Sequence, residues 1–387
     1  MPPWIEKIAT LFDHRLHSDR GTIHLHGGKI DMDATEQLLK ELSDAKGVSG
    51  HETEVRAIVR RRLELLEGSI VDQDRIGSVV CRLGDSGPRV MLAAHMDEIG
   101  FMVNHITDQG FLKFIRLGGW WSHVLLGQRV IVQTRGGDLP GVIGAKPPHL
   151  LQDEERAKLM DIRDMYIDIG AASKTEVEDA GVRIGDPVVP DSRFRAVRDG
   201  AVYMGKAFDD RAGVALMVQA MERFAAAPHP NILYGVGTVM EEVGVRGAKT
   251  SADMVSPDAA IVLEADVCGD LPGIRPEDSS IKLGGGPSLI LMEARLISNL
   301  KFRDLTIETA KELAIPLQLS IAYVGSTDGG QIHLQGIGVP TIVLAVPARH
   351  IHSHAGFIHR GDYDDTLRLL AAIIEKLDRE TVNGFIR

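Results

Sequence analysis

Histidine and carboxylate side chains recur in this chain at the ends of short apolar runs. His95 and Asp97 follow the run Val90–Ala93, and Glu264 follows the run Ala260–Leu263. Other candidates of this kind are Asp209, Glu241, Glu242 and His352. In open α/β sheets, ligands and catalytic groups collect at the carboxyl ends of strands. One carboxylate in such a place is usually a turn or helix-capping residue, but this combination indicates a metal centre.

The residue types suit a centre that holds two divalent ions. Two such ions about 3.5–4 Å apart need a bridging carboxylate, because it offsets their repulsion. Histidine nitrogens and further carboxylate oxygens complete the coordination and leave room for a shared water. Adjacent glutamates such as Glu241 and Glu242 can take two different roles at such a centre. One binds metal while the other accepts a proton as general base. Metal-activated hydrolysis is therefore the predicted chemistry.

Several motifs keep the order and approximate spacing of one known family. They are Gly47–Glu52, Ala94–Gly100, Lys146–Leu150, Tyr166–Ala171, Gly185–Asp186, Lys206–Gly213, Glu241–Glu242, Asp270–Gly273, Ser326–Asp328 and Pro347–Ser353. On these segments the chain resembles the tetrahedral (TET) or glutamyl aminopeptidases, the forty-second family of metallopeptidases. The resemblance covers about residues 32–380, which is nearly the whole chain.

The resemblance implies a role for each candidate residue. One ion would be held by His95, Asp209 and Glu264. The other would be held by Asp209, Glu242 and His352, so that Asp209 bridges the pair. Glu241 would act as the general base, and Asp97 would orient His95. The family also implies zinc or cobalt as the metal, peptides as substrates, and a homo-oligomer in which dimers assemble to a dodecamer.

One position departs from the family pattern. The family usually has Asp where this chain has Glu264, six residues before Asp270. Glutamate can bind metal through the same carboxylate, but its extra methylene shifts the ion or the backbone. Asp266 is the alternative ligand, since alternation along a strand puts it on the same side as Glu264. The register of the motif favours Glu264.

Composition excludes several classes of protein. Of the 387 residues, 44% are hydrophobic and 25% are charged, as in globular domains. The net charge of −11 argues against nucleic acid and anionic membranes as partners. Two cysteines are too few for a disulfide framework. No apolar run of about 18 residues appears, and the N-terminus lacks the apolar core of a signal peptide. We therefore expect a cytoplasmic protein.

Helical and strand patterns alternate on both sides of a central region that is rich in short strands. This alternation predicts an α/β fold, a mixed-sheet α/β/α metallopeptidase domain formed by residues 31–100 and 203–387. Closely spaced strands with Gly and Pro between them predict a small β-barrel domain inserted at residues 101–202. In the family such an insertion mediates subunit contacts, so we expect a dimerisation role. Residues 1–30 form an N-terminal extension outside the resemblance.

Three functions of different classes are compatible with these residues. The leading hypothesis is an aminopeptidase that hydrolyses the N-terminal peptide bond through metal-activated water. A deacylase or amidohydrolase of N-acylated amino acids would use the same site on another substrate. A non-catalytic scaffold protein is the third alternative. Loss of Glu241 or of a metal ligand would have supported the scaffold, but every expected position holds a competent side chain.

Overall fold

A computed structural model describes residues 32–153, 158–322 and 324–386 of the chain. Its main feature is an 11-stranded mixed sheet with the strand order β1-β2-β12-β3-β13-β16-β17-β11-β10, extended by β14 and β15 beside β16. The strands of this sheet are β1 (Ile70–Gln73), β2 (Val79–Leu83), β3 (Arg89–His95), β10 (Arg195–Val197), β11 (Val202–Gly205), β12 (Ile232–Thr238), β13 (Ala259–Val267), β14 (Ser288–Met292), β15 (Gln318–Ile321), β16 (Thr341–Arg349) and β17 (Gly356–His359).

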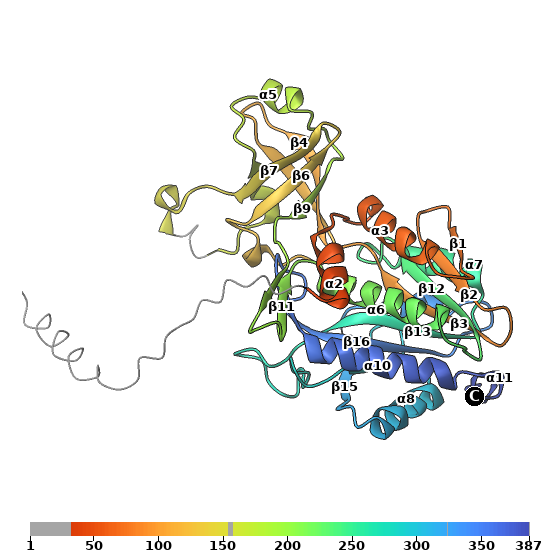
Figure 1. Ribbon diagram of the computed structural model, residues 1–387. Coiled ribbons are helices and arrows are strands. Elements are labelled where there is room, and N and C mark those ends of the chain that lie inside the picture. The colour runs from red at the N-terminus through yellow and green to blue at the C-terminus, as the bar shows by residue number, and fades with distance from the viewer. Residues whose placement is uncertain (1–31, 154–157, 323, 387) are drawn as a thin grey trace, which may run out of the picture. The chain divides into compact units, whose positions relative to one another are not determined.

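Helices cover both faces of this sheet, as Figure 1 shows. The larger core joins one face of the sheet to α2 (Ala34–Asp44), α3 (Thr53–Glu64), α6 (Phe208–Ala225), α8 (Leu300–Glu312), α10 (Arg360–Lys376) and α11 (Arg379–Gly384). A second core joins the opposite face to α7 (Arg246–Val255) and α9 (Gly329–Ile332). The result is the predicted α/β/α architecture. Among the described residues, no helix combines the length and the apolar character needed to cross a bilayer.

Strands β4 to β9 form a closed barrel in the order β4-β5-β8-β7-β6-β9. They are β4 (Gly100–Ile106), β5 (Leu112–Leu117), β6 (Arg129–Thr134), β7 (Gly137–Gly144), β8 (Tyr166–Asp168) and β9 (Pro187–Pro190). The barrel has its own apolar core, which includes Phe101, Phe114 and Trp120. It also carries the short helix α5 (Lys174–Asp179), where the Ser173 side chain accepts an N-cap hydrogen bond from the Glu176 backbone N–H. The prediction of an inserted small β-barrel is therefore confirmed.

The barrel strands end before residue 202, the expected limit of the inserted domain. The last barrel strand ends at Pro190, and β10 already pairs with β11 in the large sheet. The division into residues 31–100 with 203–387 and 101–202 stays a prediction in its exact limits. The expected extension at residues 1–30 lies outside the described part of the chain.

Four neighbouring strands of the large sheet run parallel and bring their carboxyl ends to one edge. Strand β3 pairs in parallel with β12 and β13, and β13 pairs in parallel with β16. Strands β3, β13 and β16 are buried along almost their whole length, which explains their nearly continuous apolar sequences. The polar residues at their carboxyl ends therefore meet at one place although they are far apart in sequence.

Candidate metal centre

His95 stands at the end of β3 with only 2% of its surface exposed. Its Nε2 lies 2.9 Å from Asp209 Oδ1 and 3.6 Å from Glu264 Oε1. Asp209 comes from the first turn of α6, and Glu264 comes from β13. Three segments far apart in sequence thus place one imidazole and two carboxylates around a common point.

His352 makes the corresponding arrangement on the other side of Asp209. Its Nε2 lies 3.4 Å from Asp209 Oδ2 and 3.2 Å from Glu242 Oε1. Glu242 follows the end of β12, and His352 follows the end of β16. The two carboxylate oxygens of Asp209 therefore face two different histidines.

The donor atoms fit divalent metal ions. Zinc–nitrogen distances of about 2.0–2.1 Å in a tetrahedral site put neighbouring donors about 3.3 Å apart, close to most of the separations found here. Within the described residues, two sets of side chains could hold an ion. They are His95 with Asp209 and Glu242, and His95 with Asp210 and Glu264. Neither set equals one of the two that the resemblance implies, although all of these residues except Asp210 belong to them. Every donor is imidazole nitrogen or carboxylate oxygen, as zinc and related metals prefer.

The charge balance of the site also favours a cation. Burial disfavours the charged form of both imidazoles, yet the surrounding carboxylates outweigh it. Glu264 and Asp209 raise the pKa of His95 well above its usual value, and Asp209 and Glu242 raise that of His352 to about 11. Burial likewise opposes the charge of Asp209, but both histidines hold the pKa of this carboxyl below its usual range. The carboxylates of the cluster thus favour positive charge at both imidazoles.

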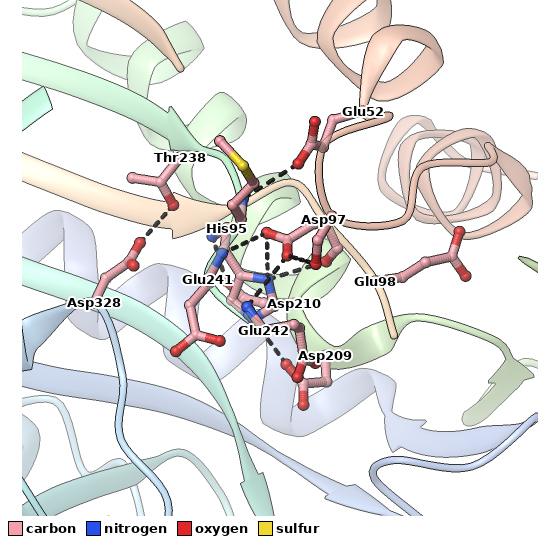
Figure 2. A network of polar contacts seen from close by, with 12 residues as sticks. Glu52, His95, Asp97, Glu98, Asp209, Asp210, Thr238, Glu241, Glu242 and Asp328 are labelled. Atoms are coloured by element: carbon pink, nitrogen blue, oxygen red, sulfur yellow. Dashed lines mark hydrogen bonds and ion pairs between the residues drawn. The ribbon is translucent and has the colours of Figure 1, made fainter. Parts of the chain in front are cut away.

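Asp97 links His95 to the two glutamates after β12. Its backbone oxygen lies 3.0 Å from His95 Nδ1, and its carboxylate lies 3.6 Å from the same atom. The carboxylate accepts the backbone N–H groups of Glu241 and Glu242 at 3.0 and 3.2 Å, and the Ser49 hydroxyl at 2.6 Å. Figure 2 shows this network around Asp97. Asp97 therefore holds the His95 imidazole through its backbone oxygen, with its carboxylate nearby, and the same carboxylate fixes the start of the Glu241–Glu242 segment.

Glu241 lines a cavity of about 630 Å³ together with His95, Asp209, Glu242, Glu264 and His352. Burial raises the pKa of Glu241 well above its usual value, and the neighbouring Glu264 and Asp328 add to the rise. The remaining walls are largely apolar and include Val245, Leu271, Ile274, Ile290 and Val324. A proton acceptor thus stands beside the candidate ligands, in a cavity large enough for a small substrate.

The structure places Glu264 and Asp266 differently, although both line the cavity. Glu264 faces His95, as described above. The Asp266 carboxylate accepts the Ser288 hydroxyl at 2.5 Å and the backbone N–H of Val267 at 2.8 Å. Of the two carboxylates, only that of Glu264 lies within ion-pair distance, below 4 Å, of the His95 imidazole.

Two buried carboxylates near the centre are not among the predicted site residues. The carboxylate of Asp210, joined to Asp209 by a cis peptide bond, accepts the backbone N–H groups of His95 and Gly213. Asp328 does not cap α9 through its side chain, and instead accepts the hydroxyl of Thr238. Sequence analysis could have found them by their position, because Asp210 and Asp328 lie in motifs that resemble the family.

A buried charge cluster also stands behind the centre. Lys206 Nζ lies 2.6 Å from Glu98 Oε1, and Arg211 Nη2 lies 3.4 Å from the same oxygen. Lys206 and Arg211 also donate to the Ala45 carbonyl. Burial, only partly offset by Glu98, lowers the pKa of Lys206 to about 8. These contacts anchor the segment before α3, which supplies Ser49 to Asp97.

Comparisons with known proteins identify the family of this chain. The sequence profile of the family described as M42 glutamyl aminopeptidase matches residues 77–369, and a profile described as AMPT matches residues 33–58. FrvX of Escherichia coli (strain K12) is 42% identical over 351 residues, which are 90% of this chain and 97% of that protein.

Solved structures give the same result. A TET aminopeptidase from a marine sediment archaeon, Thaumarchaeota archaeon SCGC AB-539-E09, is 46% identical with a TM-score of 0.89. The match covers 91% of this chain and 99% of that one. The Pyrococcus horikoshii TET1 peptidase, which can assemble into a tetrahedron or a large octahedral shell, is 30% identical with a TM-score of 0.81. That match covers 89% of this chain and 100% of the other. The chain therefore belongs to the M42 glutamyl aminopeptidase family, a family of peptide hydrolases.

Proposed function

We propose that this protein is a dinuclear-metal aminopeptidase that removes the N-terminal residue of peptides. One observation supports this proposal above all others. The two oxygens of Asp209 face His95 and His352 separately, at 2.9 and 3.4 Å. A carboxylate placed in this way can bridge two ions, as co-catalytic hydrolases require.

The proposed ligands follow from this arrangement. His95, Asp209 and Glu264 would hold one ion, and Asp209, Glu242 and His352 would hold the other. Zinc or cobalt suits this mixture of imidazole and carboxylate donors. When bound, the two ions lower the pKa of a water molecule and polarise the carbonyl of the scissile bond. Asp97 keeps the His95 ring in place through Nδ1, in the manner of carboxylate–histidine–metal sites.

Glu241 carries the proton in the proposed reaction. Its carboxylate lies in the cavity without being needed as a ligand, so it can accept a proton from the attacking water. The water oxygen then forms a bond to the carbonyl carbon of the N-terminal residue. As the carbon–nitrogen bond breaks, Glu241 returns the proton to the leaving amine. The products are a free amino acid and a peptide shortened by one residue.

Metal removal and a substrate comparison test this function. The purified protein would be stripped with a chelator, dialysed, and assayed with aminoacyl-p-nitroanilides before and after addition of zinc or cobalt. We expect activity to disappear on stripping and to return with about two ions per chain. Full peptidase activity in the metal-free protein would contradict the proposal. Faster hydrolysis of N-acetylated amino acids than of free-amine substrates would favour an amidohydrolase instead.

We further propose that the protein is a homo-oligomer built from dimers, and that the barrel carries the dimer contact. The proposal is supported by the assembly named for the P. horikoshii TET1 peptidase. Exposed Trp121 on the barrel turn adds to it, because tryptophan is enriched at interfaces. Sedimentation velocity of the full chain and of Trp121→Glu tests both points. We expect a large assembly that the charged variant dissociates, whereas an unchanged sedimentation coefficient would place the contact elsewhere.

A further inference from the structure

The turn that follows β5 in the barrel reaches the candidate metal centre. A Cβ atom on Gly119 would lie 2.7 Å from Nδ1 and 2.9 Å from Cε1 of His352. A Cβ atom on Gly118 would lie 3.0 Å from Glu242 Oε2 and 2.3 Å from Ile99 Cγ2. The backbone of this turn is thus in close contact with two of the three proposed ligands of the second ion.

The position of the His352 ring explains why this contact matters. Its Nε2 points to Asp209 and Glu242, while the opposite side of the ring, with Nδ1, faces Gly119. His352 lies on a loop with φ of +57°, and its side chain is 38% exposed. His95, by contrast, is 2% exposed and is held through Nδ1 by Asp97. The Gly119 backbone therefore restrains the His352 ring, as Asp97 restrains the His95 ring. It does so by close contact, whereas Asp97 uses a hydrogen bond.

The turn itself is held firmly by its neighbours. Trp120 Nε1 donates to the Gly100 carbonyl at 3.0 Å, and its ring stacks on Phe101 with 4.8 Å between centroids. Arg116 Nη1 donates to the Trp120 carbonyl at 2.8 Å. On the other side, the Trp120 ring packs against His354, with 5.1 Å between centroids. His354 is only two residues from His352, so the turn contacts the ligand loop at two points.

We propose that the Gly118–Gly119–Trp120 turn positions His352 and Glu242, so that the barrel sets the affinity of the second ion. The turn is a wall behind these two ligands and does not bind metal itself. The atoms nearest to a Cβ on either glycine belong to Ile99, Glu242 and His352, so the first ion should be insensitive to the turn. This inference rests on the proposed function for the identity of the ligands.

Gly119→Ala is the direct test, with Gly136→Ala as its matched control. Both glycines belong to the barrel region and neither has a positive φ. A methyl group on Gly136 would have only Thr134 Oγ1 within 4 Å, at 3.6 Å. Calorimetric titration of the stripped proteins with zinc and with cobalt gives the affinity of each ion. We expect Gly119→Ala to weaken one ion by ~10–100-fold, as for other changes that disturb ligand orientation. The other ion and the control should match the wild type.

A second variant identifies which ion is affected. Glu242→Ala removes a proposed ligand of the second ion only. If Gly119 acts on that ion, the double variant Gly119→Ala/Glu242→Ala should bind the remaining ion as tightly as Glu242→Ala does. Additive losses at the remaining ion would overturn the inference, because they would show a general disturbance.

Other outcomes are equally decisive. Two unchanged ions in Gly119→Ala would overturn the positioning role while leaving the proposed function intact. A wild-type protein that binds no metal would overturn both. If Gly119→Ala does not fold, Trp120→Phe keeps an aromatic ring at this position but removes the hydrogen bond to Gly100 and part of the ring packing on Phe101 and His354. It should weaken the second ion selectively by several-fold, and equal affinities for both ions in this variant and the wild type would contradict the inference.

Discussion

The carboxylate of Asp97 accepts a hydrogen bond of 3.0 Å from the backbone N–H of Glu241. The same side chain lies beside Nδ1 of His95. Although burial opposes its charge, contact with His95 and Ser49 keeps the pKa of Asp97 below its usual value. Asp97 therefore stays ionised and connects a proposed ligand to the proposed base. A change at this residue should affect both the metal and the reaction.

Asp97→Asn tests this connection. The amide keeps the shape of the side chain, but its NH₂ group must face a backbone N–H or the His95 ring. We expect ~10–100-fold weaker metal binding at the His95 site and a lower kcat even at saturating metal. Ser49→Ala, which removes one donor to Asp97, should have a much smaller effect. Wild-type affinity and kcat in Asp97→Asn would show that the network is dispensable.

Glu241→Gln should separate proton transfer from metal binding. The glutamine fills the same space but cannot accept the proton from water, so kcat should fall by ~10²–10⁴. Metal analysis should still find two ions per chain. Glu242→Gln is the comparison variant, since it should lose metal as well as activity. If Glu241→Gln keeps a kcat near that of the wild type, another residue is the base.

Removing Glu264 and removing Asp266 should have different consequences for metal binding. Glu264 lies 3.6 Å from His95 Nε2, whereas Asp266 is hydrogen-bonded to Ser288. Glu264→Ala should lower occupancy at the His95 site and leave the Glu242–His352 site largely filled. Asp266→Ala should act more mildly, through the packing around the site. Calorimetric titration of both variants decides between them, and loss of one whole site in Asp266→Ala alone would reverse the assignment.

Glu98→Gln should destabilise the folded protein, because it leaves Lys206 and Arg211 buried without their counter-charge. Breaking such a buried pair costs about 3–5 kcal/mol. Glu64→Gln is the control, since it removes an exposed ion pair with Arg60 that is worth about 0–1 kcal/mol. Urea denaturation of both variants at pH 7 measures the difference. Similar free energies of unfolding for the two variants would contradict the prediction.

The cost of Glu98→Gln should also depend on pH. Burial lowers the pKa of Lys206 to about 8 in the folded protein, below its unfolded value of about 10.4. Below pH 8 Lys206 stays charged in the folded wild type. The variant therefore loses the full contribution of the Lys206–Glu98 pair to the free energy of unfolding. As pH rises, Lys206 becomes neutral first in the variant, where Glu98 no longer raises its pKa, and then in the wild type as pH passes 8, so the difference in unfolding free energy should shrink. Denaturation at pH 7 and pH 9.5 checks the sign.

The sequence by itself determined the kinds of residue at the centre and the order of the elements that carry them. Apolar runs of β3, β13 and β16 could be recognised because strands buried on both faces need apolar side chains throughout. The polar residues directly after these runs could be recognised as well, because they interrupt an otherwise apolar sequence. The barrel was predictable from its closely spaced strands, since turns leave a local signal in Gly and Pro.

Tertiary structure alone decided which atoms meet. Alternation along β13 puts Glu264 and Asp266 on the same face, and only the tertiary structure brings the first beside His95 of β3 and the second beside Ser288 of β14. The contact of Gly119 with His352 joins residues more than 200 positions apart. Because glycine has no side chain, the sequence does not indicate what its backbone contacts. Such long-range contacts depend on how both domains pack as a whole. A local sequence pattern carries no information about that packing.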